Sequence, residues 1–153
     1  MAKVKKKNQG MIDVSDKEIT KRTAIARATI KLGEKAFKAL IRGECPKGNV
    51  LETSKVAGIM AAKSVPNIIP LCHPLELKKI SIDHKLDKKK KSVDIIAEVS
   101  YEGKTGVEME ALTAVSIAAL TIYDMMKWAD KGMVISDTKL LHKSGGRSGV
   151  YNR

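Results

Sequence analysis

This sequence of 153 residues is poor in aromatic side chains and in cysteine, and it has no long hydrophobic run. Aromatic residues make up 3% of the chain, so the core must be mostly aliphatic. The two cysteines form no CxxC pair, which argues against a disulfide scaffold and a zinc knuckle. The most apolar stretch, 111–123, is too short to span a bilayer, and no apolar stretch follows the basic N-terminus. We expect a cytoplasmic protein with no signal peptide and no membrane partner.

The composition is that of a globular chain, with 43% hydrophobic and 30% charged residues. Its formal net charge of +12 would suit a nucleic-acid partner. However, the lysine runs 3–7 and 85–91 supply two thirds of that excess, so most of it does not lie on a folded face. We therefore expect no nucleic-acid partner, a flexible basic tail over residues 1–10, and one domain over 11–153.

Hydrophobic periodicity predicts a mixed fold. Small apolar residues alternate with other residues over 21–32, which indicates a strand, and 34–42 has helical spacing. A second helix is expected after Asn49, a favourable N-cap residue, with a stripe of small residues that permits close packing. Strands are expected at 75–86 and 92–101, joined by the lysine-rich turn 85–91, and a last strand at 133–141.

The longest predicted helix, 105–131, begins with a capping-box pattern, Thr105-x-x-Glu108. It is apolar around most of its circumference, which favours burial on more than one side and suggests contact with another subunit. With the first two helices taken as one layer, the order is β-α-β-β-α-β. The predicted fold is α+β and ferredoxin-like, an antiparallel sheet with helices on one face.

Three segments combine lysine with glycine where the backbone can offer free N–H groups. They begin at Lys47, at Lys104 and at Lys143, the last of which a glycine-rich segment follows. Helix N-termini and glycine-rich turns bind anions, and lysine adds a point charge for phosphate. Each segment alone fits a solvated turn, but three of them in one short chain favour a polyphosphate ligand.

Carboxyl groups and a histidine supply further candidates. Asp124 and Lys127 lie three residues apart and so share one helix face, either as an ion pair at a helix end or as a desolvated acid/base pair. Glu108 and Glu110 occupy a first helical turn, where acidic residues are common. His73 follows Cys72 between two prolines, as a hydrogen-bonding or acid/base group. No ligand spacing supports a metal site.

Several blocks of this sequence closely resemble the MoaC family of cyclic pyranopterin monophosphate synthases, the molybdenum cofactor biosynthesis proteins C. The similarity runs in order through nearly all of residues 11–149. The blocks that carry it are 11–15, 48–63, 69–75, 104–114, 119–125 and 140–149.

The resemblance implies a lyase that converts 3′,8-cyclo-7,8-dihydroguanosine triphosphate into cyclic pyranopterin monophosphate and pyrophosphate. A radical-SAM enzyme would supply this substrate from GTP. The resemblance also implies a ferredoxin-like catalytic domain and a homohexamer, a trimer of dimers with active sites at the dimer interfaces. It implies no obligatory cofactor, and Mg²⁺ is compatible with the triphosphate.

The family's site residues carry over onto positions of the same residue type. The resemblance implies catalytic roles for Asp124, Lys127, Lys47 and Lys143. It implies substrate binding by two segments, whose members are Leu71, Cys72, His73, Glu108, Met109 and Glu110.

The alternative is a basic RNA-binding module, because the same order of elements occurs in RNA-recognition domains. Those domains stack bases on aromatic side chains of the sheet, in a strand with a defined aromatic motif. Neither 75–86 nor 92–101 contains that motif, and Tyr101 is the only aromatic residue in them.

Overall fold

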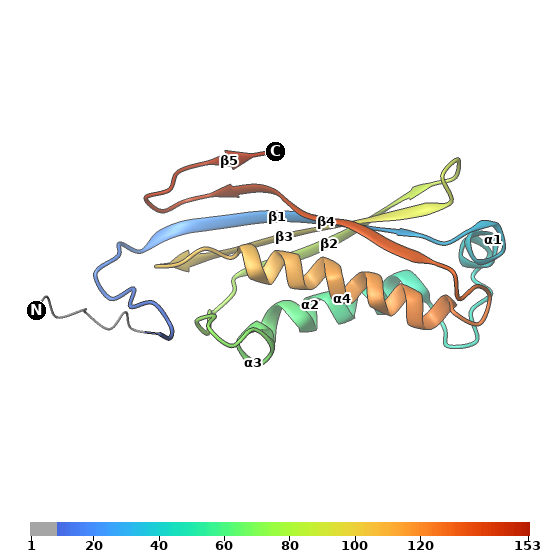
Figure 1. The fold of residues 1–153 in the computed structure, drawn as a ribbon, viewed down its shortest axis with the longest axis horizontal. Helices are drawn as coiled ribbons and strands as arrows, with labels where there is room; N and C mark the ends of the chain where they lie inside the picture. Colours follow the sequence, from blue (N-terminus) through green and yellow to red (C-terminus); the bar gives the residue numbers. More distant parts are fainter. Residues whose placement is uncertain (1–8) are drawn as a thin grey trace, which may run out of the picture.

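The computed structural model describes residues 9–153, so most of the predicted basic tail lies outside the described residues. The elements follow in the order β1 (Thr20–Lys31), α1 (Glu34–Arg42), α2 (Val50–Lys63), α3 (Val65–Ile68), β2 (Lys79–Asp87), β3 (Ser92–Gly103), α4 (Glu108–Met126), β4 (Val134–Ser144) and β5 (Tyr151–Asn152). The strands form one antiparallel sheet in the order β2-β3-β1-β4-β5. Its first four strands have the ferredoxin-like order, which confirms the predicted fold class (Figure 1).

Alternation along the central strands decides which face of the sheet is covered. In β1 the side chains of Ala24, Ala26, Ala28 and Ile30 are fully buried, and the residues between them are only partly buried. The long helices α2 and α4 lie side by side over this face (Figure 1). Small residues in β1 let α4 approach the sheet closely, and the aliphatic core lies between these layers.

The helices α2 and α4 also pack closely on each other. Gly58 is buried, and a Cβ atom built on it would lie 3.0 Å from the Ala114 carbonyl oxygen of α4. The predicted close packing through small residues is therefore present. The predicted N-cap is also confirmed, because the Asn49 side chain accepts a hydrogen bond from the Glu52 N–H at 3.1 Å.

The predicted capping box at 105–108 is wrong, and the long helix is shorter than expected at both ends. The Tyr101 hydroxyl donates to the Thr105 carbonyl at 2.6 Å and accepts from the Thr105 N–H at 3.0 Å. These bonds hold Thr105 in the loop before the helix, so α4 begins at Glu108 without a side-chain cap. Glu108 instead curls back against Gly106.

Other boundaries differ by a few residues. The strand predicted from residue 75 begins at Lys79, because only Lys78 before it bonds to β3, and the last strand continues to Ser144. The helix α3 and the strand β5 were not predicted. By length and composition α4 could cross a membrane, but half of its most apolar window is buried, as in the core helix of a globular fold.

Tyr101 is not available for stacking on a nucleic-acid base. Its side chain is 5% exposed and lies on the helix-covered side of β3. The RNA-binding alternative therefore lacks the aromatic surface that it requires.

Candidate active site

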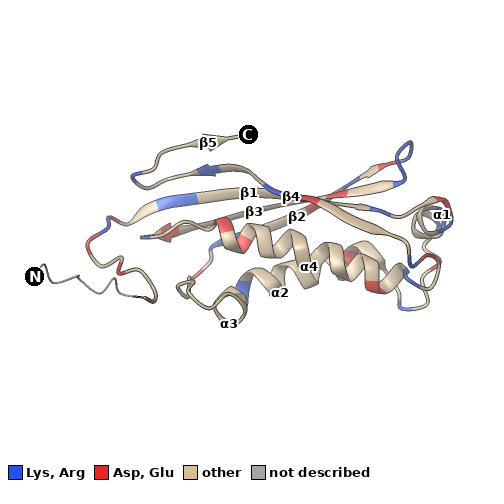
Figure 2. Cartoon of the chain, in the orientation of Figure 1, with Lys and Arg blue, Asp and Glu red and all other residues tan. Residues whose placement is uncertain are grey.

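The candidate residues lie at both ends of α4. Glu108, Met109 and Glu110 form its first turn, whereas Asp124 is in its last turn and Lys127 follows directly. At 1.5 Å of rise per residue, Glu108 and Asp124 are about 24 Å apart along the helix axis. Figure 2 shows acidic residues at both ends of this helix. The single chain thus carries two separate groups of candidate side chains.

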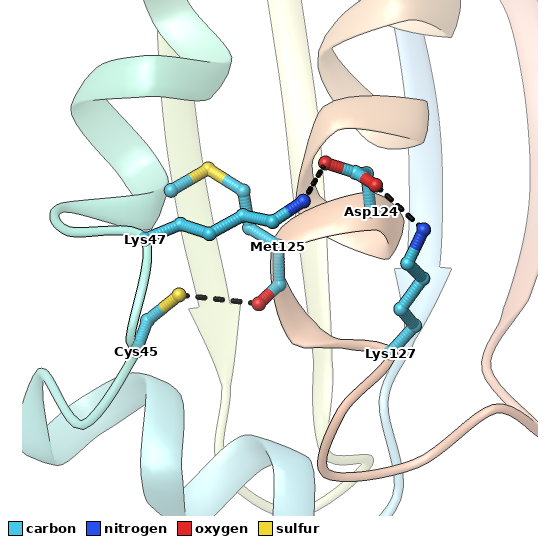
Figure 3. Close-up of polar contacts among 5 residues, drawn as sticks. All are labelled: Cys45, Lys47, Asp124, Met125 and Lys127. Atoms are coloured by element: carbon cyan, nitrogen blue, oxygen red, sulfur yellow. Dashed lines mark hydrogen bonds and ion pairs between the residues drawn. The ribbon is translucent and has the colours of Figure 1, made fainter.

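At the C-terminal end, Asp124 bridges two lysines (Figure 3). Its Oδ2 lies 2.6 Å from Nζ of Lys47, and its Oδ1 lies 2.8 Å from Nζ of Lys127. Lys47 belongs to the turn before α2, and the Cys45 thiol fixes this turn by donating to the Met125 carbonyl at 3.1 Å. Three of the four predicted catalytic residues therefore come together here.

The two lysines stabilise the ionised form of Asp124. Their hydrogen bonds, from Lys127 first and Lys47 second, lower the Asp124 pKa to about 2, and Asp124 in turn raises the pKa of Lys127. Of the two alternatives for Asp124 and Lys127, the single chain has the ion pair at a helix end and not the desolvated pair, because the two side chains are 50% and 51% exposed. At neutral pH the cluster is an ionised carboxylate between two ammonium groups, with net positive charge.

A cavity of about 300 Å³ adjoins this cluster. Besides Lys47, Asp124 and Lys127, it is lined by Lys131 and by Trp128, whose side chain is 47% exposed. Sequence reasoning did not select Trp128. Its signal is that it is the only tryptophan in the sequence and stands next to Lys127, near the end of the predicted helix 105–131.

At the N-terminal end of α4, all six predicted substrate-binding residues line one cavity of about 310 Å³. The lining comes from the segment 71–73 and the first turn of α4, together with Ile12 and Val14. The two segments are far apart in sequence, and they meet here because residues 69–74 follow α3, which contacts α4.

Glu110 is the most deeply buried ionisable group in this cavity, with 3% of its surface exposed. Burial, reinforced by the neighbouring charge of Glu108, raises its pKa to about 7. Burial and Glu110 also raise the pKa of the Cys72 thiol, which stays protonated. Glu110 can thus hold or release a proton near neutral pH.

A second cavity of about 480 Å³ lies at the same end of the molecule. Lys17 lines both cavities, so they adjoin. Arg22 and Arg147 also line the second cavity, as does Ser148, which accepts a hydrogen bond from Nζ of Lys143. The fourth predicted catalytic residue, Lys143, is therefore beside a basic cavity and not beside Asp124.

Sequence reasoning missed Arg22 and Lys17. The signal for Arg22 was present, because it continues the buried alternation of β1 and puts a charged side chain where that pattern requires an apolar one. Lys17 lies in an irregular segment, where no periodicity distinguishes a binding lysine from a solvated one.

Lys104, in the remaining lysine–glycine segment, contacts the backbone of the N-terminal segment. Its Nζ donates to the Ser15 carbonyl at 2.6 Å and fastens the N-terminal segment to the loop before α4. Within residues 9–153, no three His, Cys, Asp or Glu side chains gather in a way that could hold a metal ion.

Comparison with known proteins gives a consistent result. The sequence model of the MoaC family matches residues 11–146. The chain is 55% identical to the cyclic pyranopterin monophosphate synthase of Staphylococcus carnosus, over 95% of this chain and 91% of that protein. It is 54% identical to the protein of the same name from Methylobacterium nodulans, over 92% of this chain and 88% of that protein.

Proposed function

The chain belongs to the MoaC family of molybdenum cofactor biosynthesis enzymes, and on that premise we propose a reaction and an arrangement of its site. The substrate is 3′,8-cyclo-7,8-dihydroguanosine triphosphate, and the products are cyclic pyranopterin monophosphate and pyrophosphate. The names of the relatives support this reaction, as do the adjoining basic and carboxyl-lined cavities at one end of α4.

In this proposal the second cavity receives the triphosphate. Lys17, Arg22, Arg147 and Lys143 supply positive charge there. Closing the cyclic phosphate forms a bond from a substrate hydroxyl to the α-phosphorus and breaks the bond to the β-phosphate. Lysine and arginine side chains stabilise the negative charge that develops on the departing pyrophosphate.

The cavity beside Glu110 and His73 then receives the guanine-derived ring. Opening the imidazole ring and building the pterin require proton transfers to and from ring nitrogens. Glu110, with its pKa near 7, is suited to give and take back a proton at this pH. The Asp124 cluster supplies the complementary groups, a carboxylate and the Lys127 ammonium. The carboxylate can accept a proton only when substrate draws the two lysines away from it, because they hold its pKa at about 2.

The separation of the two groups along α4 is the observation on which this arrangement depends. About 24 Å of helix lies between Glu108 and Asp124, which is more than one small substrate can bridge. A second copy of the chain resolves this if its α4 runs antiparallel across a twofold axis near Ile117. Such an isologous contact would bring Asp124 of one copy beside Glu110 of the other, twice per dimer.

The outward face of α4 suits this contact. Between its two charged ends it carries Thr113, Ile117 and Leu120, with Leu120 53% exposed.

We further propose, on the family resemblance, that three such dimers form a hexamer in the cytoplasm. A radical-SAM GTP cyclase would supply the substrate. Mg²⁺ would enter as a counter-ion of the triphosphate, which turnover with and without EDTA tests.

A coupled assay tests the proposed reaction. The purified chain is given the cyclic dihydroguanosine triphosphate, and pyrophosphate and the fluorescent oxidised pterin are both measured. We expect both products in equal amounts. Pyrophosphate without pterin would indicate a phosphatase-like activity, and no turnover together with salt-sensitive RNA binding would favour the alternative module.

A further inference from the structure

The Arg22 side chain is fixed by a hydrogen bond from its Nε atom. It lies on the helix-covered face of β1, is 8% exposed, and donates from Nε to the Gly103 carbonyl at 3.0 Å. Its side chain lines the second cavity. A buried guanidinium of this kind can present a fork of N–H donors in one fixed orientation, which suits phosphate oxygens.

Gly146 lies directly against the outer end of this guanidinium. A Cβ atom built on Gly146 would lie 2.1 Å from Nη1 and 2.8 Å from Cζ of Arg22, well inside van der Waals contact. The Gly146 N–H donates to Oγ1 of Thr20 at 3.2 Å, which ties the loop to the start of β1. The backbone of Gly146 thus forms a wall that limits where the guanidinium can lie.

Comparison with Gly149 shows that the contact of Gly146 with Arg22 is more than a consequence of turn geometry. Gly146 and Gly149 both have left-handed backbones, with φ of +76° and +68°. A Cβ atom on Gly149 would meet nothing within 4 Å. Alanine at either position has the same unfavourable φ, but only at Gly146 does it also displace a side chain of the cavity.

We propose that Gly146 is a positioning residue that, together with Thr20, holds the Arg22 guanidinium in the orientation that binds substrate phosphates. This proposal rests on the proposed function, because it takes the second cavity as the triphosphate site. The displaced atoms are the end of a flexible side chain, so Gly146→Ala should misplace the donors without disrupting the fold.

A double-mutant cycle tests the proposal. The variants are Gly146→Ala, Arg22→Gln, the two combined, and Gly149→Ala as the matched control. Calorimetry gives the Kd of pyrophosphate, and the coupled assay gives KM and kcat. We expect Gly146→Ala to raise Kd and KM roughly tenfold, the effect of misplacing a charged hydrogen bond, with kcat within about threefold of wild type. Gly149→Ala should change Kd and KM by less than about twofold, since only the backbone cost applies.

The combined variant decides whether Gly146 acts through Arg22. If it does, Gly146→Ala adds nothing to the Kd of Arg22→Gln, whereas an additive effect would overturn the proposal. Equal effects of Gly146→Ala and Gly149→Ala would also overturn it.

A second variant covers the case in which Gly146→Ala does not fold, as judged by its melting curve. Thr20→Val removes the acceptor of the Gly146 N–H and keeps the side-chain shape, so it should also raise the pyrophosphate Kd. An unchanged Kd would contradict the proposal. If the wild type gave no pterin, the proposed function would fail, but the pyrophosphate cycle would still measure the coupling between Gly146 and Arg22.

Discussion

Oδ2 of Asp124 lies 2.6 Å from Nζ of Lys47, a contact that joins the last turn of α4 to the turn before α2. Because Oδ1 also binds Lys127, one carboxylate sets the position of two ammonium groups. Replacing it should therefore affect both lysines together, and the double contact is the reason to expect a loss of turnover larger than that from one ion pair.

Asp124→Asn should reduce kcat by roughly 10²- to 10⁴-fold, the usual contribution of a positioned acid or base, with the Kd of substrate nearly unchanged. Asp137→Asn is the matched control. Asp137 is exposed, makes only long contacts of 3.9 Å to Arg27 and Lys139, and has a left-handed backbone that asparagine tolerates. Single-turnover kinetics and calorimetry separate the two quantities. Normal turnover by Asp124→Asn would exclude the proton-transfer role.

The titration of Glu110 should appear as one limb in the pH dependence of kcat. With a pKa raised to about 7, the carboxyl is protonated below that pH and ionised above it. If Glu110 donates the proton, kcat falls as pH rises through about 7, and Glu110→Gln loses this limb together with most of the activity.

The same shift predicts that the free energy of unfolding also falls as pH rises. A pKa raised above the unfolded value stabilises the folded state at low pH, and this contribution is lost as pH rises through about 7. Glu110→Gln should therefore have a higher melting temperature than wild type at pH 8, with a smaller difference at pH 5. Equal melting temperatures at pH 8 would show that burial does not disfavour the ionised form of Glu110.

Lys17→Ala should raise the KM for the triphosphate roughly tenfold and weaken inhibition by pyrophosphate, because Lys17 lines the basic cavity and would form charge-assisted hydrogen bonds to phosphate there. Lys35→Ala removes a charge of the same kind from the exposed side of α1 and should leave both quantities unchanged. Similar values for the two variants would indicate that only the overall charge attracts the substrate.

Gly58→Ala should destabilise the fold. Alanine is normally the better helix former by about 1 kcal/mol. Here its methyl group would lie 2.3 Å from Cδ1 of Ile82 and 3.0 Å from the Ala114 carbonyl oxygen, and overpacking of this kind costs about 1–3 kcal/mol. Urea unfolding measures the difference. A variant more stable than wild type would mean that α2 and α4 can separate without cost.

The sequence predicted the parts of the fold that local patterns determine. Alternation over residues 21–32 located β1, and Asn49 marked the start of α2. The predicted capping box does not form, because the hydroxyl of Tyr101, from the preceding strand, is hydrogen-bonded to the Thr105 backbone. No local pattern contains that contact, and boundaries set by tertiary contacts were missed for the same reason.

The candidate site, like the fold, could be predicted from the sequence only in part. The spacing of Asp124 and Lys127 predicted their contact, since residues three apart share a helix face. The resemblance supplied the other residues but not their distribution, with Lys47 at one end of α4 and Lys143 at the other. Residues that meet only through sheet pairing and helix packing leave no mark in the spacing of one segment.

A mixing experiment tests most directly the claim that each active site combines both ends of α4 from two copies. Glu110→Gln and Asp124→Asn, each inactive alone, are unfolded, mixed in equal amounts and refolded together. Half of randomly formed dimers then contain one of each, and each such dimer has one of its two sites fully wild type, so activity should return to about a quarter of the wild-type value. No recovery from the mixture, in refolding conditions that restore wild-type activity, would contradict the shared site.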